Sequence, residues 1–78
     1  MTRRQVYKRL KNFSMKNDVS GDYHRHMKSV DFILTRILGL SHDDLGDMNW
    51  RDYFHDGANP IQSVKLAVQD GLLDDMEY

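Results

Sequence analysis

Cysteine is absent from this chain of 78 residues, proline occurs once, and no apolar run is longer than the three residues 32–34. Without cysteine the chain has no disulfide and no thiolate chemistry, which is typical of proteins in a reducing compartment such as the cytoplasm. Apolar runs this short do not span a membrane. No apolar segment follows the basic N-terminus, so we expect no signal peptide.

Catalytic and ligand-binding motifs are also missing. The sequence contains no glycine-rich phosphate loop, nucleophile motif or nucleotide fingerprint. His24 and His26 would point about 200° apart on a helix, and no histidine pair has the close spacing of a zinc site. A His/Asp site at His42 or His55 would require loops to converge. We therefore predict no enzyme activity, no catalytic, metal or cofactor-binding residues, and no cofactor.

The length limits the chain to one domain, residues 1–78. A chain this short buries only about 60–65% of the surface that its unfolded form exposes, so its core is marginal. Homodimerisation is one way in which such a chain could bury more surface.

One helix is predicted to organise the fold, between a cap at Asp22 and a left-handed stop at Gly39. Its apolar residues recur at helical spacing and form one stripe. They are Tyr23, Met27, Val30, Leu34, Ile37 and Leu38, with Phe32 and Ile33 expected to widen the stripe. We expect a Schellman ending at Gly39-Leu40.

The remaining sequence predicts further helices and no strand. A capping box of Thr2 and Gln5 opens the first helix, and Asn59-Pro60 opens the last one. The expected ranges are about 2–17, 22–38, a short element at 43–47, a short helix from 49 or 50 to 56, and a last helix from 60 to about 70, before an acidic tail at about 72–78. The predicted fold is all-α, a small helical bundle in which the two longer N-terminal helices form a hairpin and the short C-terminal helices pack across it.

The charges are divided between the two halves of the chain. Residues 1–36 hold nine Lys and Arg against three acids, a net charge of +6, and residues 37–78 hold two against nine, a net charge of −7. The two halves could neutralise each other within one fold or between two copies. Alternatively, each half could present a charged face to a partner of opposite charge.

The basic N-terminal residues could contact a polyanion such as nucleic acid. They are Arg3, Arg4, Lys8, Arg9, Lys11 and Lys16. The stretch Gly39-Leu40-Ser41 also resembles the turn of a DNA-binding helix-turn-helix motif. The recognition helix after that turn would carry Asp43, Asp44 and Asp47, which would repel the duplex, so we disfavour this interpretation.

The most distinctive segment runs from Trp50 to Pro60 and carries three aromatic residues beside a glycine stop and a proline start. Its aromatic residues could fill the small core or could anchor a protein interface, where Trp, Tyr and Arg are enriched. We predict a protein interface here, formed by Trp50, Arg51, Asp52, Tyr53, Phe54 and Asp56.

The same segment carries a pattern of aromatic-Arg-Asp-x-Phe-x-Asp-Gly-x-x-Pro-x-x-x-Val between Trp50 and Val64. This pattern resembles small uncharacterised helical proteins of bacteriophages and prophages. The resemblance implies a small accessory protein that is made in a bacterial cell and binds a host or phage macromolecule. The expected function is therefore non-catalytic, stoichiometric modulation or inhibition of a host protein; the alternative is a nucleic-acid-binding accessory protein that uses the basic N-terminal helix.

Overall fold

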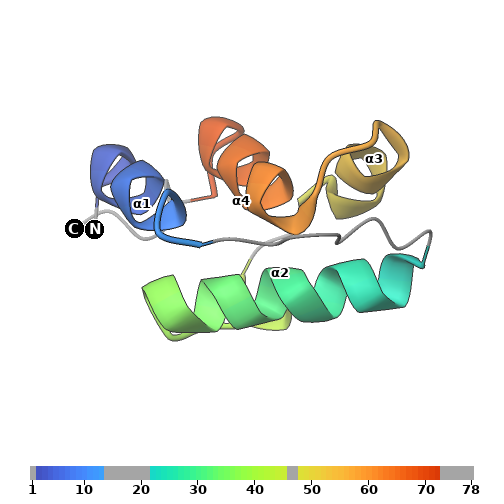
Figure 1. Cartoon of the computed structure of the whole chain (residues 1–78), viewed down its shortest axis with the longest axis horizontal. Helices are drawn as coiled ribbons and strands as arrows, with labels where there is room; N and C mark the ends of the chain where they lie inside the picture. The colour runs from blue at the N-terminus through green and yellow to red at the C-terminus, as the bar shows by residue number, and fades with distance from the viewer. Residues whose placement is uncertain (1, 14–21, 46–47, 73–78) are drawn as a thin grey trace.

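A computed structural model describes residues 2–13, 22–45 and 48–72 of the chain. These residues form helices and no strand, which confirms the all-α class. The elements are α1 (Arg3–Leu10), α2 (Tyr23–Leu38), a 3₁₀ helix η1 (His42–Asp44), α3 (Trp50–His55) and α4 (Pro60–Gln69). They lie in two layers, with α1, α4 and α3 side by side in one layer and the long helix α2 running beneath them (Figure 1).

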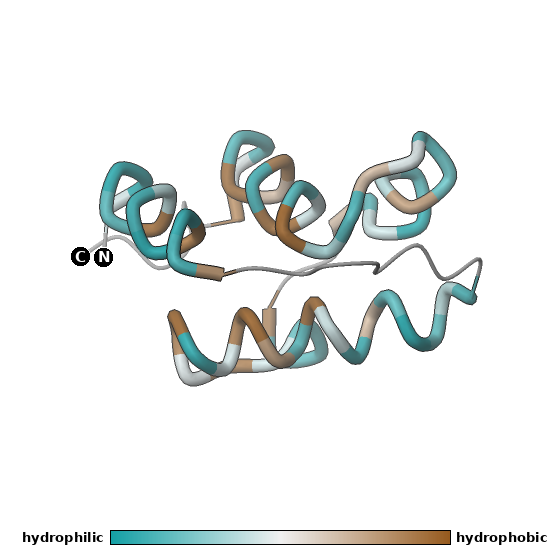
Figure 2. The backbone as a smooth tube through the Cα atoms, in the orientation of Figure 1, coloured by the Kyte–Doolittle hydropathy of each residue, from teal (hydrophilic) through white to brown (hydrophobic). Residues whose placement is uncertain are grey.

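Helix α4 is the centre of the packing, because it contacts α2, α1 and α3. Its face toward α2 includes Ser63, whose fully buried Oγ atom lies 2.9 Å from Nε2 of His26 in α2, and Ala67 one turn later is also fully buried. The apolar sides of the helices turn toward the space between the layers (Figure 2). The core consists of Val6, Leu10, Met27, Val30, Ile33, Leu34, Ile37, Trp50, Tyr53, Val64, Ala67, Val68 and Leu72.

The structure does not confirm the predicted hairpin of the two N-terminal helices. The first helix was expected to reach residue 17, but α1 ends at Leu10, where the amides of Asn12 and Phe13 turn to i−3 carbonyls. Residues 14–17 lie outside the described part. A helix of eight residues that buries only Val6 and Leu10 offers α2 little surface. Helix α4 therefore replaces α1 as the main partner of α2.

The predicted helix starts are confirmed at three positions. Thr2 and Asn59 form capping boxes with the residues three positions later, and Asp22 accepts a hydrogen bond from the amide of His24. These contacts satisfy amides that have no partner within their own helix. Asn49 precedes α3, but its side chain makes no capping hydrogen bond.

Schellman endings occur on α3 and α4, whereas the sequence predicted one on α2. Gly57 and Gly71 have φ of 89° and 108°, and each donates to an i−3 carbonyl. The next residues, Ala58 and Leu72, donate to i−5 carbonyls, which completes the motif. Helix α2 does end at Gly39 as predicted, in a left-handed cap whose amide donates to Thr35.

Two residues and one short element differ from their predicted roles. Phe32 was expected to widen the apolar stripe of α2, but it lies beside the stripe and is 53% exposed. Leu72 was assigned to the acidic tail, but the ending of α4 folds it into the core; residues 73–78 lie outside the described part. The element expected at 43–47 is the single 3₁₀ turn η1, capped by Ser41 as predicted, and Asp47 lies outside the described part.

Candidate functional site

The predicted interface on α3 divides into inward and outward side chains. Trp50 and Tyr53 are only 5% and 7% exposed, and their rings pack edge to face at 5.9 Å. Helix α3 has only six residues and contacts both α2 and α4, so the same apolar face packs against both helices. The structure therefore places these two predicted interface residues in the core, where they fix the position of α3.

Tyr53 also makes a polar contact at the edge of the core. Its hydroxyl donates a hydrogen bond to the carboxylate of Asp70, the residue that follows α4. Burial raises the pKa of Tyr53 well above its usual value, and the hydrogen bond and negative charge of Asp70 add to the effect. The tyrosine thus stays neutral and ties α3 to the end of α4.

The other four predicted residues have accessible side chains. Arg51, Asp52 and Asp56 are exposed, and Phe54 is half-buried. The Arg51 guanidinium lies 4.7 Å from the ring centroid of Tyr23, at the start of α2. We call Tyr23, Arg51, Asp52, Phe54 and Asp56 the α3 surface.

The rings of the α3 surface support one another. Phe54 packs edge to face on Tyr23 at 5.5 Å and on His26 at 5.0 Å. Such contacts hold the side chains in place before a partner binds. Less rotamer entropy is then lost on binding. Sequence reasoning missed Tyr23 because it belongs to another helix, and its place in the α2 stripe indicated only burial.

His26 lies beneath this surface and is buried. Its Nε2 atom lies 2.9 Å from the Oγ atom of Ser63, which is also fully buried. A substrate cannot reach this serine, so the pair is a polar contact between α2 and α4 and not a nucleophile with its base.

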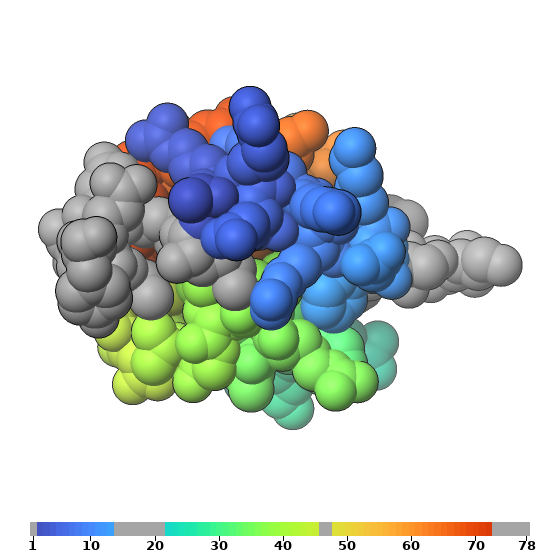
Figure 3. Space-filling view, turned by 90° about the vertical axis from the view of Figure 1, so that its left-hand side faces the viewer, coloured from blue at the N-terminus to red at the C-terminus, as the bar shows by residue number. Residues whose placement is uncertain are grey.

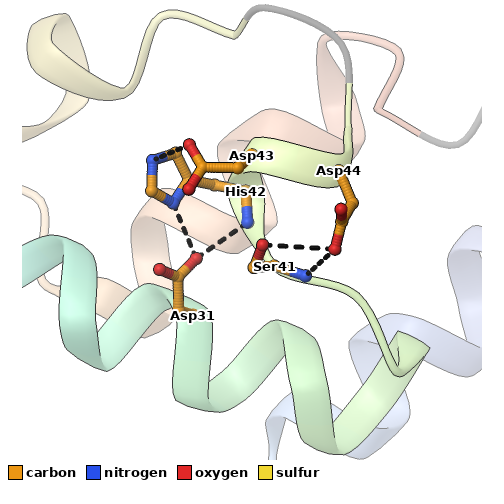
Figure 4. A network of polar contacts seen from close by, with 5 residues as sticks. All are labelled: Asp31, Ser41, His42, Asp43 and Asp44. Carbon is orange, nitrogen blue, oxygen red and sulfur yellow. Dashed lines mark hydrogen bonds and ion pairs between the residues drawn. The ribbon is translucent and has the colours of Figure 1, made fainter.

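A second polar cluster surrounds His42 in η1 (Figure 4). Its backbone amide and its Nδ1 atom both lie 2.7 Å from Oδ1 of Asp31, and its Nε2 atom lies 3.2 Å from Oδ1 of Asp43. Ser41 donates to Asp44 and not to His42, so the cluster lacks the serine–histidine bond of a catalytic triad. The contacts with Asp31 fasten the loop after Gly39 onto α2.

The described residues hold no group of three metal-ligating side chains, and none of their helices has the length and apolar character to cross a membrane.

The helix-turn-helix interpretation is wrong. The turn after α2 leads into η1, a single 3₁₀ turn of three residues, and not into a recognition helix.

The predicted polyanion residues gather on α1 and its end. Their described side chains are exposed, and they are Arg3, Arg4, Lys8, Arg9 and Lys11. Lys16 lies outside the described part. Helix α1 exposes four cations, Lys11 follows directly after it, and residues 2–13 contain no acid, so the outer side of this segment is uniformly basic.

Comparisons of the chain with protein-family models, with curated proteins and with solved structures give no match.

Proposed function

We propose that this chain is a small, non-catalytic binding protein that modulates or inhibits a protein partner by forming a stoichiometric complex through the α3 surface. The observation that carries the proposal is the packed group of Arg51, Tyr23 and Phe54 on the outside of α3, with Asp52 and Asp56 beside it. Arginine and aromatic side chains supply most of the binding energy in protein interfaces.

The charges of this surface favour a partner with a basic rim. Asp52 and Asp56 are exposed one helical turn apart, and Arg51 is placed over an aromatic ring. Carboxylates at the edge of an interface raise the association rate with a positively charged partner, and the rings supply buried apolar area. The phage-protein resemblance of residues 50–64 agrees with a bacterial partner inside the host cell.

The test compares two charge reversals of equal size. Tagged wild-type chain is used to capture a partner from bacterial lysate, and the purified pair is then mixed to measure its stoichiometry by sedimentation. We expect an equimolar complex that Arg51→Glu weakens about tenfold or more, which corresponds to about 1.4 kcal/mol. Lys28→Glu, on an exposed position of α2 outside the α3 surface, should leave the affinity unchanged.

Phe54→Ala supplies a second test, because it removes the ring without changing charge. Unchanged binding in both Arg51→Glu and Phe54→Ala would refute the α3 surface as the interface. A captured enzyme whose activity is unaffected by a saturating amount of the chain would refute modulation or inhibition.

A further inference from the structure

A groove of about 370 Å³ lies between α1 and α4, and none of the residues that line it belongs to the α3 surface. Tyr7, Leu10 and Lys11 line it from α1, and Ile61 and Lys65 line it from α4. Leu10 is buried, Tyr7 and Ile61 are half-buried, and both lysines are exposed. Helix α1 faces the viewer in Figure 3, with α4 visible above it.

The two helices that form the groove carry only positive charge. Residues 2–13 contain five cations and no acid, and Lys65 is the single charged residue of α4. Among the described residues, no carboxylate lies within ion-pair distance of Lys11 or Lys65. The Lys65 ammonium instead lies 5.8 Å from the ring centroid of Tyr7. Two cations that have no carboxylate partner within the described part of the chain thus border an apolar groove.

We propose that this groove binds an acidic amphipathic segment of a partner protein. Apolar side chains of the segment would contact Leu10, Ile61 and the ring of Tyr7, while its carboxylates would pair with Lys11 and Lys65. This is the helix-in-groove mode of peptide recognition, with charge complementarity at the rim. The proposal is independent of the α3 surface, because the two sets of residues do not overlap.

The lining favours a peptide over nucleic acid. A phosphate backbone is bound mainly by cations and hydrogen-bond donors, and it gains little from aliphatic side chains such as Leu10 and Ile61. An acidic segment with apolar side chains uses both parts of the groove. Burial of those side chains adds roughly 25 cal/mol per Å² to the attraction between charges.

The test measures fluorescence anisotropy of a fluorescein-labelled peptide built from glutamate, leucine and tryptophan, with its apolar residues spaced along one helical face. We expect the double variant Lys11→Glu/Lys65→Glu to weaken binding about tenfold or more. The matched control Lys8→Glu/Lys28→Glu makes the same change in net charge at exposed positions outside the groove and should change affinity less than about threefold. Lys11→Arg/Lys65→Arg keeps the charge and should retain binding.

Two further probes separate the occupants. A peptide with the same glutamates and serine in place of the apolar residues should bind about tenfold more weakly. A single-stranded oligonucleotide of equal charge should bind more weakly than the amphipathic peptide.

Equal weakening by the two double variants, or equal binding of the two peptides, would overturn the proposal in favour of unspecific charge attraction. Tighter binding of the oligonucleotide would overturn it in favour of nucleic acid. The wild-type chain could also fail to bind the peptide and instead form a dimer in sedimentation. If Lys11→Glu/Lys65→Glu abolishes that dimer, the occupant of the groove is a second copy of the chain and the proposal fails.

Discussion

Tyr53 joins the short helix α3 to the end of α4 through its hydroxyl and the carboxylate of Asp70. Its pKa is raised by burial first and by Asp70 second, so the folded state keeps a proton that the unfolded chain loses near pH 10. The unfolded state then binds fewer protons than the folded state as the pH rises above 10. Stability that is fully present below pH 10 is therefore lost at higher pH, with a slope of about 1.4 kcal/mol per pH unit.

Tyr53→Phe removes this proton and should remove this part of the alkaline slope. At neutral pH it should cost about 1 kcal/mol, the contribution of one hydrogen bond. The measurement is urea unfolding between pH 8 and about 11, and the difference between the two proteins cancels the titration of lysines common to both. A wild-type slope that the substitution leaves intact would show that another group controls alkaline stability.

At the scale of single elements, the two asparagines before α3 and α4 form a natural pair for comparison. Asn59 accepts from the amide of Gln62 at 2.8 Å, whereas Asn49 makes no capping bond with its side chain. Asn59→Ala should therefore lower the free energy of unfolding by about 1 kcal/mol, and Asn49→Ala by a few tenths at most. Denaturant unfolding followed by the fluorescence of Trp50, the single tryptophan, measures both. Equal losses would mean that the capping bond at Asn59 has no net value.

The link between η1 and α2 offers a second comparison of matched residues. Asp31 accepts from both the amide and the ring of His42, while Asp43 contacts only the ring and its side chain is 82% exposed. Asp31→Ala should cost about 1–2 kcal/mol because it leaves a partly buried amide without its acceptor. Asp43→Ala should cost less than about 0.5 kcal/mol. Thermal unfolding distinguishes these values, and hydrogen exchange at the His42 amide should accelerate only in Asp31→Ala.

Helix starts could be predicted from the sequence because a cap is a contact between residues two or three apart. Thr2 with Gln5 and Asn59 with Gln62 need no tertiary information. The end of α1, by contrast, depends on a tertiary contact. Phe13 leaves the helix and its ring meets Phe32 of α2 edge to face at 6.3 Å, a partner that no local pattern reveals.

The candidate site shows the same limit. The spacing of Trp50, Tyr53 and Phe54 indicated a shared face on a short helix, but not whether that face meets the core or solvent. The structure buries Trp50 and Tyr53 because α3 rests on both α2 and α4. Tyr23 joins the α3 surface from the apolar stripe of α2, so its contact with Arg51 follows only from the packing of the two helices.

At the scale of the whole molecule, helical periodicity gave the buried face of each helix but not its partner. The pairing of α2 with α4 includes the buried contact between His26 and Ser63, which lie 37 residues apart in the sequence. The structure does not confirm the hairpin predicted from chain order, because α1 is short and α4 is the main partner of α2. The resulting order places α4 between α1 and α3 and opens the basic groove on the α1 side.

The dependence of the whole fold on the buried face of α2 can be tested at two consecutive residues of this helix. Ile33 is fully buried, and Phe32 is 53% exposed. Ile33→Ala should cost about 2–5 kcal/mol through lost burial and the cavity that remains. A domain of this length has a total stability of only about 4–12 kcal/mol, so this single change removes a large part of it.

Phe32→Ala is the matched control, because it removes a larger side chain from the adjacent position. The substitution removes the edge-to-face contact with Phe13 and the contact with the Arg36 guanidinium, which lies 5.4 Å from the centroid of the Phe32 ring. We therefore expect the free energy of unfolding to fall by less than about 1 kcal/mol. Urea unfolding followed by Trp50 fluorescence and by circular dichroism should show coincident transitions in both variants. A larger loss from Phe32→Ala than from Ile33→Ala would contradict the assigned faces of α2, and with them the two-layer packing around α4.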